Sequence, residues 1–334
     1  MSKKVFKILV TGGSGFIGSE FVRQGVAQGY PLTVIDKLTY AGDPERLNAV
    51  KGKIKFYKID IADPALDAVM RKEKPAVIVN FAAETHVDRS IQDAAPFIRT
   101  NVSGTLNLME CARKNKIKKF IHISTDEVYG EIRNGKFTEE SRLQPNNPYS
   151  ATKASADLLI KAAVRTYQFP AIIVRPSNNY GSWQYPEKFI PVIILKAKRN
   201  NKIPVYGKGE HIREWLYVVD SVKAIFLVLQ KGKIGEIYNV GSNIERRNIQ
   251  TVKAILKLLQ KPETLIEFVQ DRPGHDFRYS LDCKKIHALG WRPETGFDEG
   301  MNRTLQWAEE NFDWLEGKLK YLQSYWQKVY KKTN

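Results

Sequence analysis

Two short motifs carry side chains that could move protons. Tyr149 and Lys153 lie four residues apart in a run with the composition of a helix, which would place both side chains on one face. A tyrosine with a pKa of about 10 is a poor base at neutral pH, but a neighbouring cation favours its phenolate form. The pair is therefore a candidate general base.

A second motif, Ser124-Thr125-Asp126-Glu127, follows an apolar segment at residues 120–123. Open α/β sheets bind their ligands at the carboxyl ends of strands. Two adjacent carboxylates at such a place can act as an acid and a base, each tuned by its surroundings. A solvated loop or a helix cap is the alternative interpretation of the two acids.

A glycine cluster near the amino terminus has the spacing of a dinucleotide-binding turn. Gly12 permits the tight turn, Gly15 lets the backbone approach a pyrophosphate, and Gly18 allows close helix packing. Asp36 follows the next expected strand, where a carboxylate can bind ribose hydroxyls and would repel a 2′-phosphate. The pattern predicts NAD as the cofactor, and Asp60-Ile61, after a further strand, is placed to reach the adenine.

The elements that must position these motifs alternate between strands and helices. Short β-branched or apolar runs at residues 7–10, 32–35, 54–59, 76–81 and 120–123 are separated by amphipathic stretches, the first at 16–28. This rhythm predicts a doubly wound α/β fold with a parallel sheet covered on both faces. We expect an NAD-binding Rossmann domain at 1–175 that carries the catalytic residues, and a mainly substrate-binding region at 176–334. A strand expected at 237–240 would share the first sheet.

The composition suits a globular enzyme better than a membrane or nucleic-acid-binding protein. No apolar stretch reaches the roughly 20 residues of a membrane span, and no signal peptide is evident, which predicts a cytoplasmic protein. The net charge is +17, but the basic residues are scattered along the chain and mixed with acids, and they form no nucleic-acid-binding motif. Cys111 and Cys283 have no partners at metal-ligand or disulfide spacing, so no metal site is expected.

Several longer motifs show a resemblance to a known family. The chain resembles, over nearly its whole length, the dTDP-glucose 4,6-dehydratases, members of the extended short-chain dehydrogenase/reductase family. Besides the glycine turn and the Tyr149–Lys153 pair, the resemblance rests on the segments 36–42 (DKLTYAG), 81–90 (FAAETHVDRS), 125–127 (TDE), 175–181 (RPSNNYG), 186–188 (PEK) and 271–275 (DRPGH).

The resemblance implies a redox-neutral dehydration with NAD⁺ regenerated in each turnover. Tyr149 would take the proton of the sugar 4-hydroxyl while hydride leaves C4 for NAD⁺, with Lys153 lowering the phenol pKa and Thr125 aligning the oxygen. Glu127 would then remove the C5 proton and Asp126 would protonate the departing C6 hydroxyl. Hydride would finally return to C6 and a proton to C5, which gives dTDP-4-keto-6-deoxyglucose.

The resemblance also assigns binding residues by position. The cofactor residues implied are Gly12, Gly15, Phe16, Ile17, Gly18, Asp36, Lys37, Leu38, Thr39, Asp60, Ile61, Ala82, Ala83, Thr100, Tyr149, Lys153 and Asn179. The substrate residues implied are Thr85, Thr125, Asn178, Lys188, Phe189, Pro204, Val205, Tyr206, Arg213, Asn248, Asp271, Arg272, Pro273, Gly274 and His275. Arg213 is suited to a bidentate grip on the diphosphate.

Two departures from the family pattern concern the nucleotide side. Serine replaces the usual proline in Gly181-Ser182-Trp183-Gln184, and Ser221 stands where histidine is common. These departures leave open whether the substrate carries a thymine or a uracil base, so a UDP-glucose 4,6-dehydratase is an alternative. In relatives, helices matching 101–114 and 151–167 pair two subunits, so the resemblance implies a homodimer, although such helices can equally pack onto the sheet.

Rival functions explain fewer of these residues. A sugar-nucleotide 4-epimerase shares the glycine turn, Tyr149 and Lys153 but needs no adjacent acids at 126 and 127. A decarboxylase acts on a substrate that already carries a carboxylate at C6. A nonenzymatic NAD-sensing or nucleic-acid-binding protein would account for the basic charge but not for the four proposed catalytic side chains.

Overall fold

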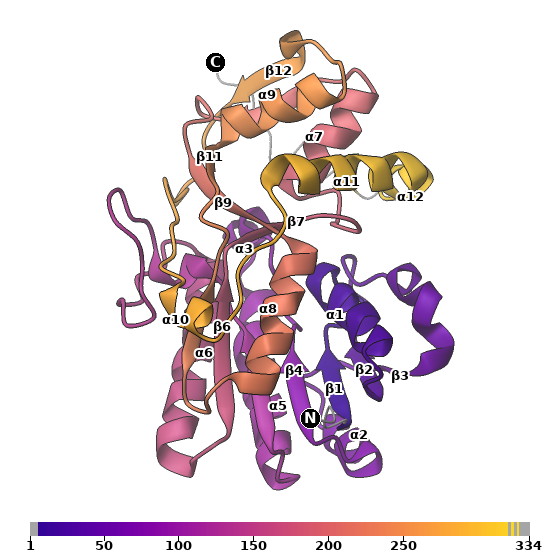
Figure 1. Cartoon of the computed structure of the whole chain (residues 1–334), viewed down its shortest axis with the longest axis vertical. Coiled ribbons are helices and arrows are strands. Elements are labelled where there is room, and N and C mark those ends of the chain that lie inside the picture. Colours follow the sequence, from indigo (N-terminus) through magenta and orange to yellow (C-terminus); the bar gives the residue numbers. More distant parts are fainter. Residues whose placement is uncertain (1–5, 320–321, 324–325, 327–334) are drawn as a thin grey trace.

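A seven-stranded parallel sheet forms the centre of the computed structural model, which describes residues 6–319, 322, 323 and 326 (Figure 1). The strand order is β10–β6–β5–β4–β1–β2–β3, and it reverses at β1, which pairs with both β2 and β4. Ligands bind beside such a reversal, at the carboxyl ends of the strands. The strands are β1 (Ile8–Thr11), β2 (Leu32–Asp36), β3 (Ile54–Lys58), β4 (Val77–Asn80), β5 (Lys119–Ile123), β6 (Ala171–Pro176) and β10 (Ile237–Val240).

Helices cover both faces of this sheet, which confirms the doubly wound α/β class. In β1, Ile8 and Val10 join the hydrophobic core under α1 and α8, whereas Leu9 joins the core under α2, α5 and α6. Burial on both faces explains why the strands are continuously apolar. The covering helices are α1 (Phe16–Ala27), α2 (Leu66–Glu73), α5 (Thr105–Lys114), α6 (Pro148–Tyr167), α8 (Val218–Lys231) and the short α10 (Lys284–Ala288).

All six segments predicted as strands form strands of this sheet, within one or two residues at each end. The exception to the prediction is β6, which the sequence pattern did not single out. Its residues Ala171–Pro176 follow α6 after a break of only three residues, so the sequence pattern does not separate this strand from the end of the helix.

A second region lies beyond the carboxyl ends of the sheet, at the top of Figure 1. It has its own hydrophobic core, built largely from four helices and the edges of two small sheets. Its helices are α7 (Phe189–Lys198), α9 (Asn248–Leu258), α11 (Phe297–Glu310) and α12 (Phe312–Gly317). Its sheets are β11 (Glu245–Arg247), β9 (Ile212–Tyr217) and β7 (Asn178–Tyr180), and β12 (Ile266–Val269) with β8 (Ile203–Tyr206).

The chain returns to the first sheet in the middle of this second region. β10 pairs in parallel with β6, and α8 packs beside α1, so residues 218–240 belong to the first layer structure. The strand expected at 237–240 is therefore confirmed. The remaining short elements are α3 (Val87–Gln92), α4 (Ala95–Phe97), the π-helical η2 (Ile98–Gly104), and the 3₁₀ turns η1 (Pro44–Lys53), η3 (Asp126–Tyr129) and η4 (Glu263–Leu265).

The end of the described chain is tied to the loop after β2. Trp314 donates its indole N–H to Asp43 at 2.8 Å, and Lys318 forms an ion pair with the same carboxylate at 2.6 Å. The buried Arg46 lies over the Trp314 ring and donates to the carbonyls of Ser14 and Ala41. Helix α12 and the residue after it thus support the loop that follows Asp36.

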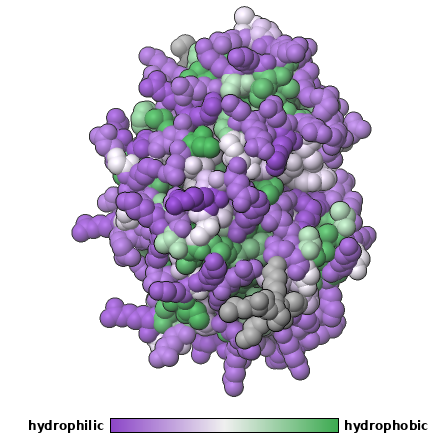
Figure 2. All heavy atoms as spheres, in the orientation of Figure 1, coloured by the Kyte–Doolittle hydropathy of each residue, from purple (hydrophilic) through white to green (hydrophobic). Residues whose placement is uncertain are grey.

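The outer surface agrees with a chain of scattered charge. Hydrophilic residues cover most of the face in Figure 2, and hydrophobic residues form separate small areas on it. Within the described ranges, no helix combines the length and apolar character that crossing a bilayer requires.

Candidate active site

One cavity runs along the carboxyl ends of the central strands, from the glycine turn to the segment after β5. Every residue predicted to hold the cofactor lines it except Leu38. Leu38 has a left-handed backbone (φ 57°), and its N–H donates to Asp36, so it shapes the turn instead of lining the cavity. The lining cofactor residues are Gly12, Gly15, Phe16, Ile17, Gly18, Asp36, Lys37, Thr39, Asp60, Ile61, Ala82, Ala83, Thr100, Tyr149, Lys153 and Asn179.

The glycine turn leaves no room for larger residues. Gly12 has a φ of 67°, and a Cβ there would lie 2.6 Å from the backbone nitrogen of Ala82. A Cβ at Gly18 would lie 2.2 Å from the carbonyl oxygen of Gly12. Helix α1 begins directly after the turn without a side-chain cap, so its first N–H groups remain for an anion such as a pyrophosphate.

Asp36 closes the opposite side of this turn. One of its carboxylate oxygens accepts from Ser14 N–H at 2.9 Å and the other from Leu38 N–H at 2.8 Å. Each carboxylate oxygen has a second lone pair, so both can still accept from ribose hydroxyls. The glycines, the uncapped helix and this carboxylate together fit the adenosine diphosphate half of NAD.

The three residues after β5 form a tight turn at the inner end of the cavity. Thr125 is the N-cap of η3, and its hydroxyl accepts from Glu127 N–H at 3.3 Å. Asp126 is 1% exposed, and one of its oxygens accepts from the Thr125 hydroxyl at 3.1 Å. The two acids predicted at a strand end thus both line the cavity, and Asp126 is the more deeply buried of the two.

Burial raises the pKa of both acids. The pKa of Asp126 lies well above its ordinary value because the carboxyl is desolvated, and Glu127 and Glu214 add to the rise. Desolvation also raises the pKa of Glu127, while Arg272 and Arg213 oppose the rise. Asp126 is therefore the group better suited to hold a proton, and Glu127, which faces the cations, is better suited to accept one.

Tyr149 and Lys153 occupy the first two turns of α6, and both line the cavity. Lys153 donates to the Ile123 carbonyl at 2.7 Å and lies 3.3 Å from His122, and desolvation lowers its pKa to about 8. Burial and Glu127 raise the pKa of Tyr149, whereas a hydrogen bond with Thr125 acts in the opposite direction. The protein groups alone therefore do not lower the pKa of Tyr149 as expected, because desolvation outweighs the hydrogen bond with Thr125.

A buried ion pair holds α6 against the sheet behind Lys153. Asp157, on the next turn of α6, accepts from Arg175 of β6 at 2.9 Å, and both side chains are at most 1% exposed. Arg175 also donates to the Tyr129 hydroxyl at 2.8 Å. These contacts fix the position of the helix that carries Tyr149 and Lys153.

Asp157→Asn is expected to reduce the free energy of unfolding by about 3–5 kcal/mol, because it leaves the buried Arg175 charge without its counterion. Equilibrium unfolding in urea measures this loss. The matched control is Glu299→Gln, which removes the exposed Glu299–Arg303 pair on α11. An exposed pair at this spacing contributes about 0.3–0.5 kcal/mol. Equal losses in the two variants would contradict the structural role of Asp157.

A second cavity opens from the first toward the upper region and shares Thr85, Glu127, Asn178 and Lys188 with it. Most residues predicted to bind the substrate line one of these two cavities, namely Thr85, Thr125, Asn178, Lys188, Phe189, Pro204, Tyr206, Arg213, Asn248, Arg272 and His275. Four predicted residues line neither, namely Val205, Asp271, Pro273 and Gly274.

Local geometry explains three of these four. Val205 lies between Pro204 and Tyr206 in β8, and the alternation of a strand turns it into the second core. Asp271 accepts from His275 at 2.6 Å and pairs with His211 at 3.2 Å. Gly274 (φ 63°) packs its backbone against Asn146.

The two arginines of the second cavity are held by different partners. Arg272 pairs with Asp88 at 2.9 Å, and Tyr206 donates to the same carboxylate at 3.1 Å. Arg213 directs its two terminal nitrogens to the carbonyls of Ile212, Asp276 and Phe277. These bonds use both hydrogens of Nη1 and one of Nη2, so the predicted bidentate grip on a diphosphate would use Nε and the second hydrogen of Nη2.

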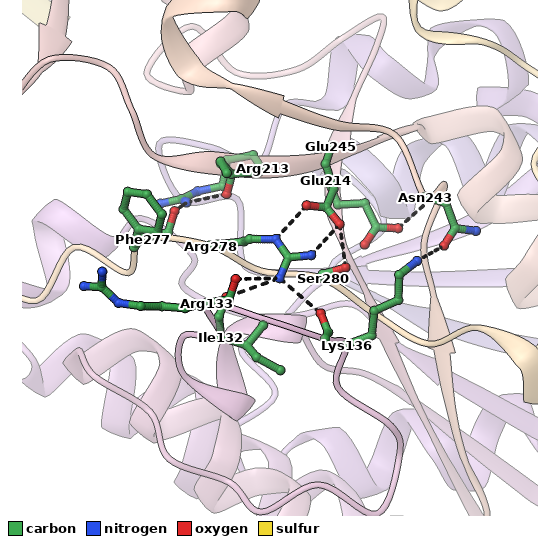
Figure 3. Close-up of polar contacts among 12 residues, drawn as sticks. Ile132, Arg133, Lys136, Arg213, Glu214, Asn243, Glu245, Phe277, Arg278 and Ser280 are labelled. Carbon is green, nitrogen blue, oxygen red and sulfur yellow. Dashed lines mark hydrogen bonds and ion pairs between the residues drawn. The ribbon is translucent and has the colours of Figure 1, made fainter.

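A polar network behind Arg213 ties three distant segments together (Figure 3). Arg278 forms two hydrogen bonds with Glu245 and donates to the carbonyls of Ile132, Arg133 and Gly135. Glu214, next to Arg213 on β9, accepts from the N–H groups of Asn243 and Leu281. The wall that carries Arg213 is therefore fixed by bonds to both neighbouring loops.

Some cavity residues were missed by the sequence prediction. Glu187 accepts from Tyr40 at 2.8 Å and pairs with Arg89 at 3.0 Å, and it lines both cavities. Gln184 and Tyr279 also line the cavities. Glu187 lies inside the Pro186-Glu187-Lys188 motif, so the motif itself was the available signal. Tyr279 had none, because it follows the loop 271–275 in a segment without a marked pattern.

Comparisons with known proteins agree with this geometry. Residues 9–304 match a family model described as GDP-mannose 4,6 dehydratase. A dTDP-glucose 4,6-dehydratase from Haemophilus influenzae is 46% identical over 330 residues, which cover 91% of this chain and 98% of that protein.

Solved structures show the same similarity. The dTDP-glucose 4,6-dehydratase DesIV from Streptomyces venezuelae, with NAD and TYD bound, has a TM-score of 0.91 and 44% identity, over 93% of this chain and 99% of the other. A UDP-glucose 4-epimerase from Thermus thermophilus, in complex with NAD, has a TM-score of 0.86 and 29% identity, over 91% and 99% of the two chains.

Proposed function

This chain belongs to the family of the dTDP-glucose 4,6-dehydratases, and on that premise we propose that it converts dTDP-glucose to dTDP-4-keto-6-deoxyglucose and water. It is an NAD-dependent hydro-lyase. The observation that carries the proposal is the Thr125-Asp126-Glu127 turn, which lines the same cavity as Tyr149 at the end of β5 and in which Thr125 and Asp126 are buried. A 4-epimerase has no use for this pair of acids.

The roles of the protein groups follow from their burial and charge. NAD, when bound, supplies the acceptor that takes a hydride from C4 and later returns it to C6. Tyr149 takes the proton of the 4-hydroxyl. Glu127 removes the C5 proton, which the neighbouring carbonyl makes acidic, and Asp126 protonates the departing C6 hydroxyl. The raised pKa of Asp126 supports its role as the acid, and the nearby arginines support Glu127 as the base.

The nucleotide diphosphate is proposed to lie in the second cavity. Lys188, Arg213 and Arg272 bring positive charge to its walls, which suits a dianionic diphosphate. We keep the division of the chain at residue 175 as part of this proposal, with residues 1–175 holding the cofactor and 176–334 mainly the substrate. We place the activity in the cytoplasm, where the free cysteines Cys111 and Cys283 suit a reducing compartment.

The test of this function is a substrate comparison. Purified protein is incubated separately with dTDP-glucose and UDP-glucose, with and without added NAD⁺, and the loss of water is followed by mass spectrometry. Dehydration of dTDP-glucose supports the proposal. Preferential dehydration of UDP-glucose would show that the enzyme prefers a uracil nucleotide to a thymine nucleotide. A change of sugar configuration without loss of water would instead identify an epimerase.

We also propose that two copies of the chain associate through α5 and α6. Leu106 on α5, Leu158 on α6 and Ile98 on η2 are all exposed, and these three elements contact one another. Exposed hydrophobic residues gathered on neighbouring helices favour a partner surface.

The double variant Leu106→Glu/Leu158→Glu is expected to convert the dimer to a monomer, because it places charges in the proposed interface. Sedimentation equilibrium measures the mass. Leu258→Glu, on the exposed side of α9, is the matched control and should remain dimeric. A wild-type monomer, or an unchanged mass in the double variant, would contradict this interface.

A further inference from the structure

His122 is a buried titratable group that has no part in the proposed dehydration, and it touches the lysine of the Tyr149–Lys153 pair. It lies on β5, is 1% exposed, and its Nε2 is 3.3 Å from Lys153 Nζ. Its other ring nitrogen, Nδ1, lies 3.1 Å from the side-chain nitrogen of Asn80 on β4. Asn80 in turn accepts from the Thr11 hydroxyl on β1 at 2.6 Å. Side-chain contacts thus lead from β1 across three strands to the lysine of α6.

The register of the parallel sheet brings these side chains together. Thr11 is paired with Asn80 between β1 and β4, and Asn80 is paired with His122 between β4 and β5. Side chains at paired positions of neighbouring strands point to the same face of a sheet. All three are at most 1% exposed, so their neighbours, and not bulk water, decide which of their atoms carry hydrogen.

The hydrogen bonds fix the tautomer of His122. The Thr11 hydroxyl donates to Asn80 Oδ1, so the amide nitrogen of Asn80 faces the imidazole ring. An amide nitrogen can only donate, so Nδ1 of the ring must accept with its lone pair. Burial and the charges of Lys153 and Arg175 lower the pKa of His122 well below its ordinary value, which keeps the ring neutral. The single ring hydrogen is therefore on Nε2.

This Nε2 hydrogen faces the nitrogen of Lys153. Asp157 Oδ1 lies 3.9 Å from Nε2, beyond hydrogen-bond distance, and the other oxygen of Asp157 accepts from Arg175 at 2.9 Å. A neutral amine has a lone pair that can accept the hydrogen, whereas an ammonium has none and leaves a buried donor unpaired. Both forms can donate to the Ile123 carbonyl at 2.7 Å. The charge of Asp157 favours the ammonium, so the imidazole N–H acts against it.

We propose that Thr11, Asn80 and His122 form a positioning series that holds an N–H group against Lys153 and so disfavours its ammonium form. Under the proposed function, on which this inference rests, the positive charge of Lys153 favours the phenolate of Tyr149. The series therefore sets the upper pH limit of the reaction. Since burial lowers the pKa of Lys153 to about 8, the ammonium is lost, and dehydration slows, as the pH rises through about 8.

Thr11→Val tests the series, because it removes the donor to Asn80 without changing charge and keeps the shape of the side chain. Asn80 can then turn its oxygen toward His122, which moves the ring hydrogen to Nδ1 and lets Nε2 accept from the ammonium. Nitrogen NMR shifts of the imidazole rings in the holoenzyme should show hydrogen on Nε2 in the wild type and on Nδ1 in the variant. The upper pH limit of dTDP-glucose dehydration should rise by about one pH unit or more, the effect of one hydrogen bond to a charged group.

Two further variants separate this effect from a general loss of structure. Thr11→Ser keeps the hydroxyl and should keep both the tautomer and the upper pH limit of the wild type. Asn80→Asp is used if Thr11→Val does not fold. Its carboxylate accepts from Thr11 and from Nδ1–H of His122, so it should move the ring hydrogen in the same direction. The chain has five histidines, and the signal lost in His122→Gln identifies the ring.

A wild-type ring with its hydrogen on Nδ1 would overturn the inference, and so would the same upper pH limit in Thr11→Val and Thr11→Ser. The tautomer is measured without sugar nucleotide, so its result does not depend on the reaction. Failure of the wild type to release water from dTDP-glucose at neutral pH would refute the proposed function, whereas the position of the ring hydrogen would still decide the role of Asn80 and Thr11.

Discussion

Glu127→Gln is expected to separate oxidation at C4 from the elimination of water. The variant keeps Tyr149 and the cofactor cavity, so the 4-keto sugar still forms, but the amide cannot remove the C5 proton. Product formation should fall by about 10²–10⁴-fold, the usual contribution of a general base. Stopped-flow absorbance should show reduced cofactor that accumulates and persists, because the hydride has no acceptor at C6.

Glu140→Gln is the matched control, since Glu140 lies exposed on the connection that follows η3. It should behave as wild type in both measurements. Undiminished dehydration by Glu127→Gln would remove Glu127 from the mechanism, whatever the fate of the cofactor signal.

Tyr149→Phe is expected to stop the reaction one step earlier. Phe97 packs against the Tyr149 ring at a centroid distance of 6.4 Å, so a phenylalanine fits without leaving a cavity. Only the hydroxyl is lost, and with it the acceptor for the 4-hydroxyl proton. Both product and reduced cofactor should fall by about 10²–10⁴-fold. Tyr167→Phe, at the exposed end of the same helix, should leave both unchanged.

Together the two variants distinguish the order of the steps. A glutamine at 127 should give a cofactor signal without product, and a phenylalanine at 149 should give neither. A strong cofactor signal in Tyr149→Phe would show that another group accepts the first proton, and the assignment of Tyr149 as the base would be wrong.

The sheet and the inner cavity could be predicted from the sequence because local patterns determine them. The glycines, Asp36 and the residues after β5 are placed by strand ends and by one turn of helix, and each lies within a few residues of its pattern. Tyr149 and Lys153 needed only the spacing of a helix.

The outer cavity was harder to predict because contacts between distant residues shape it. Arg272 depends on Asp88, 184 residues away, and nothing near either residue indicates the other. Neighbouring residues of β8 show a second difficulty. Pro204 lines the cavity and Val205 lies in the second core, and the sequence does not reveal which face of the strand packs against that core. Arg213 lies where it was expected, but two of its bonds to backbone carbonyls depend on a loop segment more than 60 residues later.

The contact of Trp314 and Lys318 with Asp43 has a consequence for how the protein is made. The glycine turn and Asp36 leave the ribosome early, and the first strands can begin to pack as they emerge. The loop after Asp36, however, receives its support from α12 only when more than 270 further residues have been translated. The dinucleotide site, although encoded first, is therefore among the last parts of the molecule to be completed.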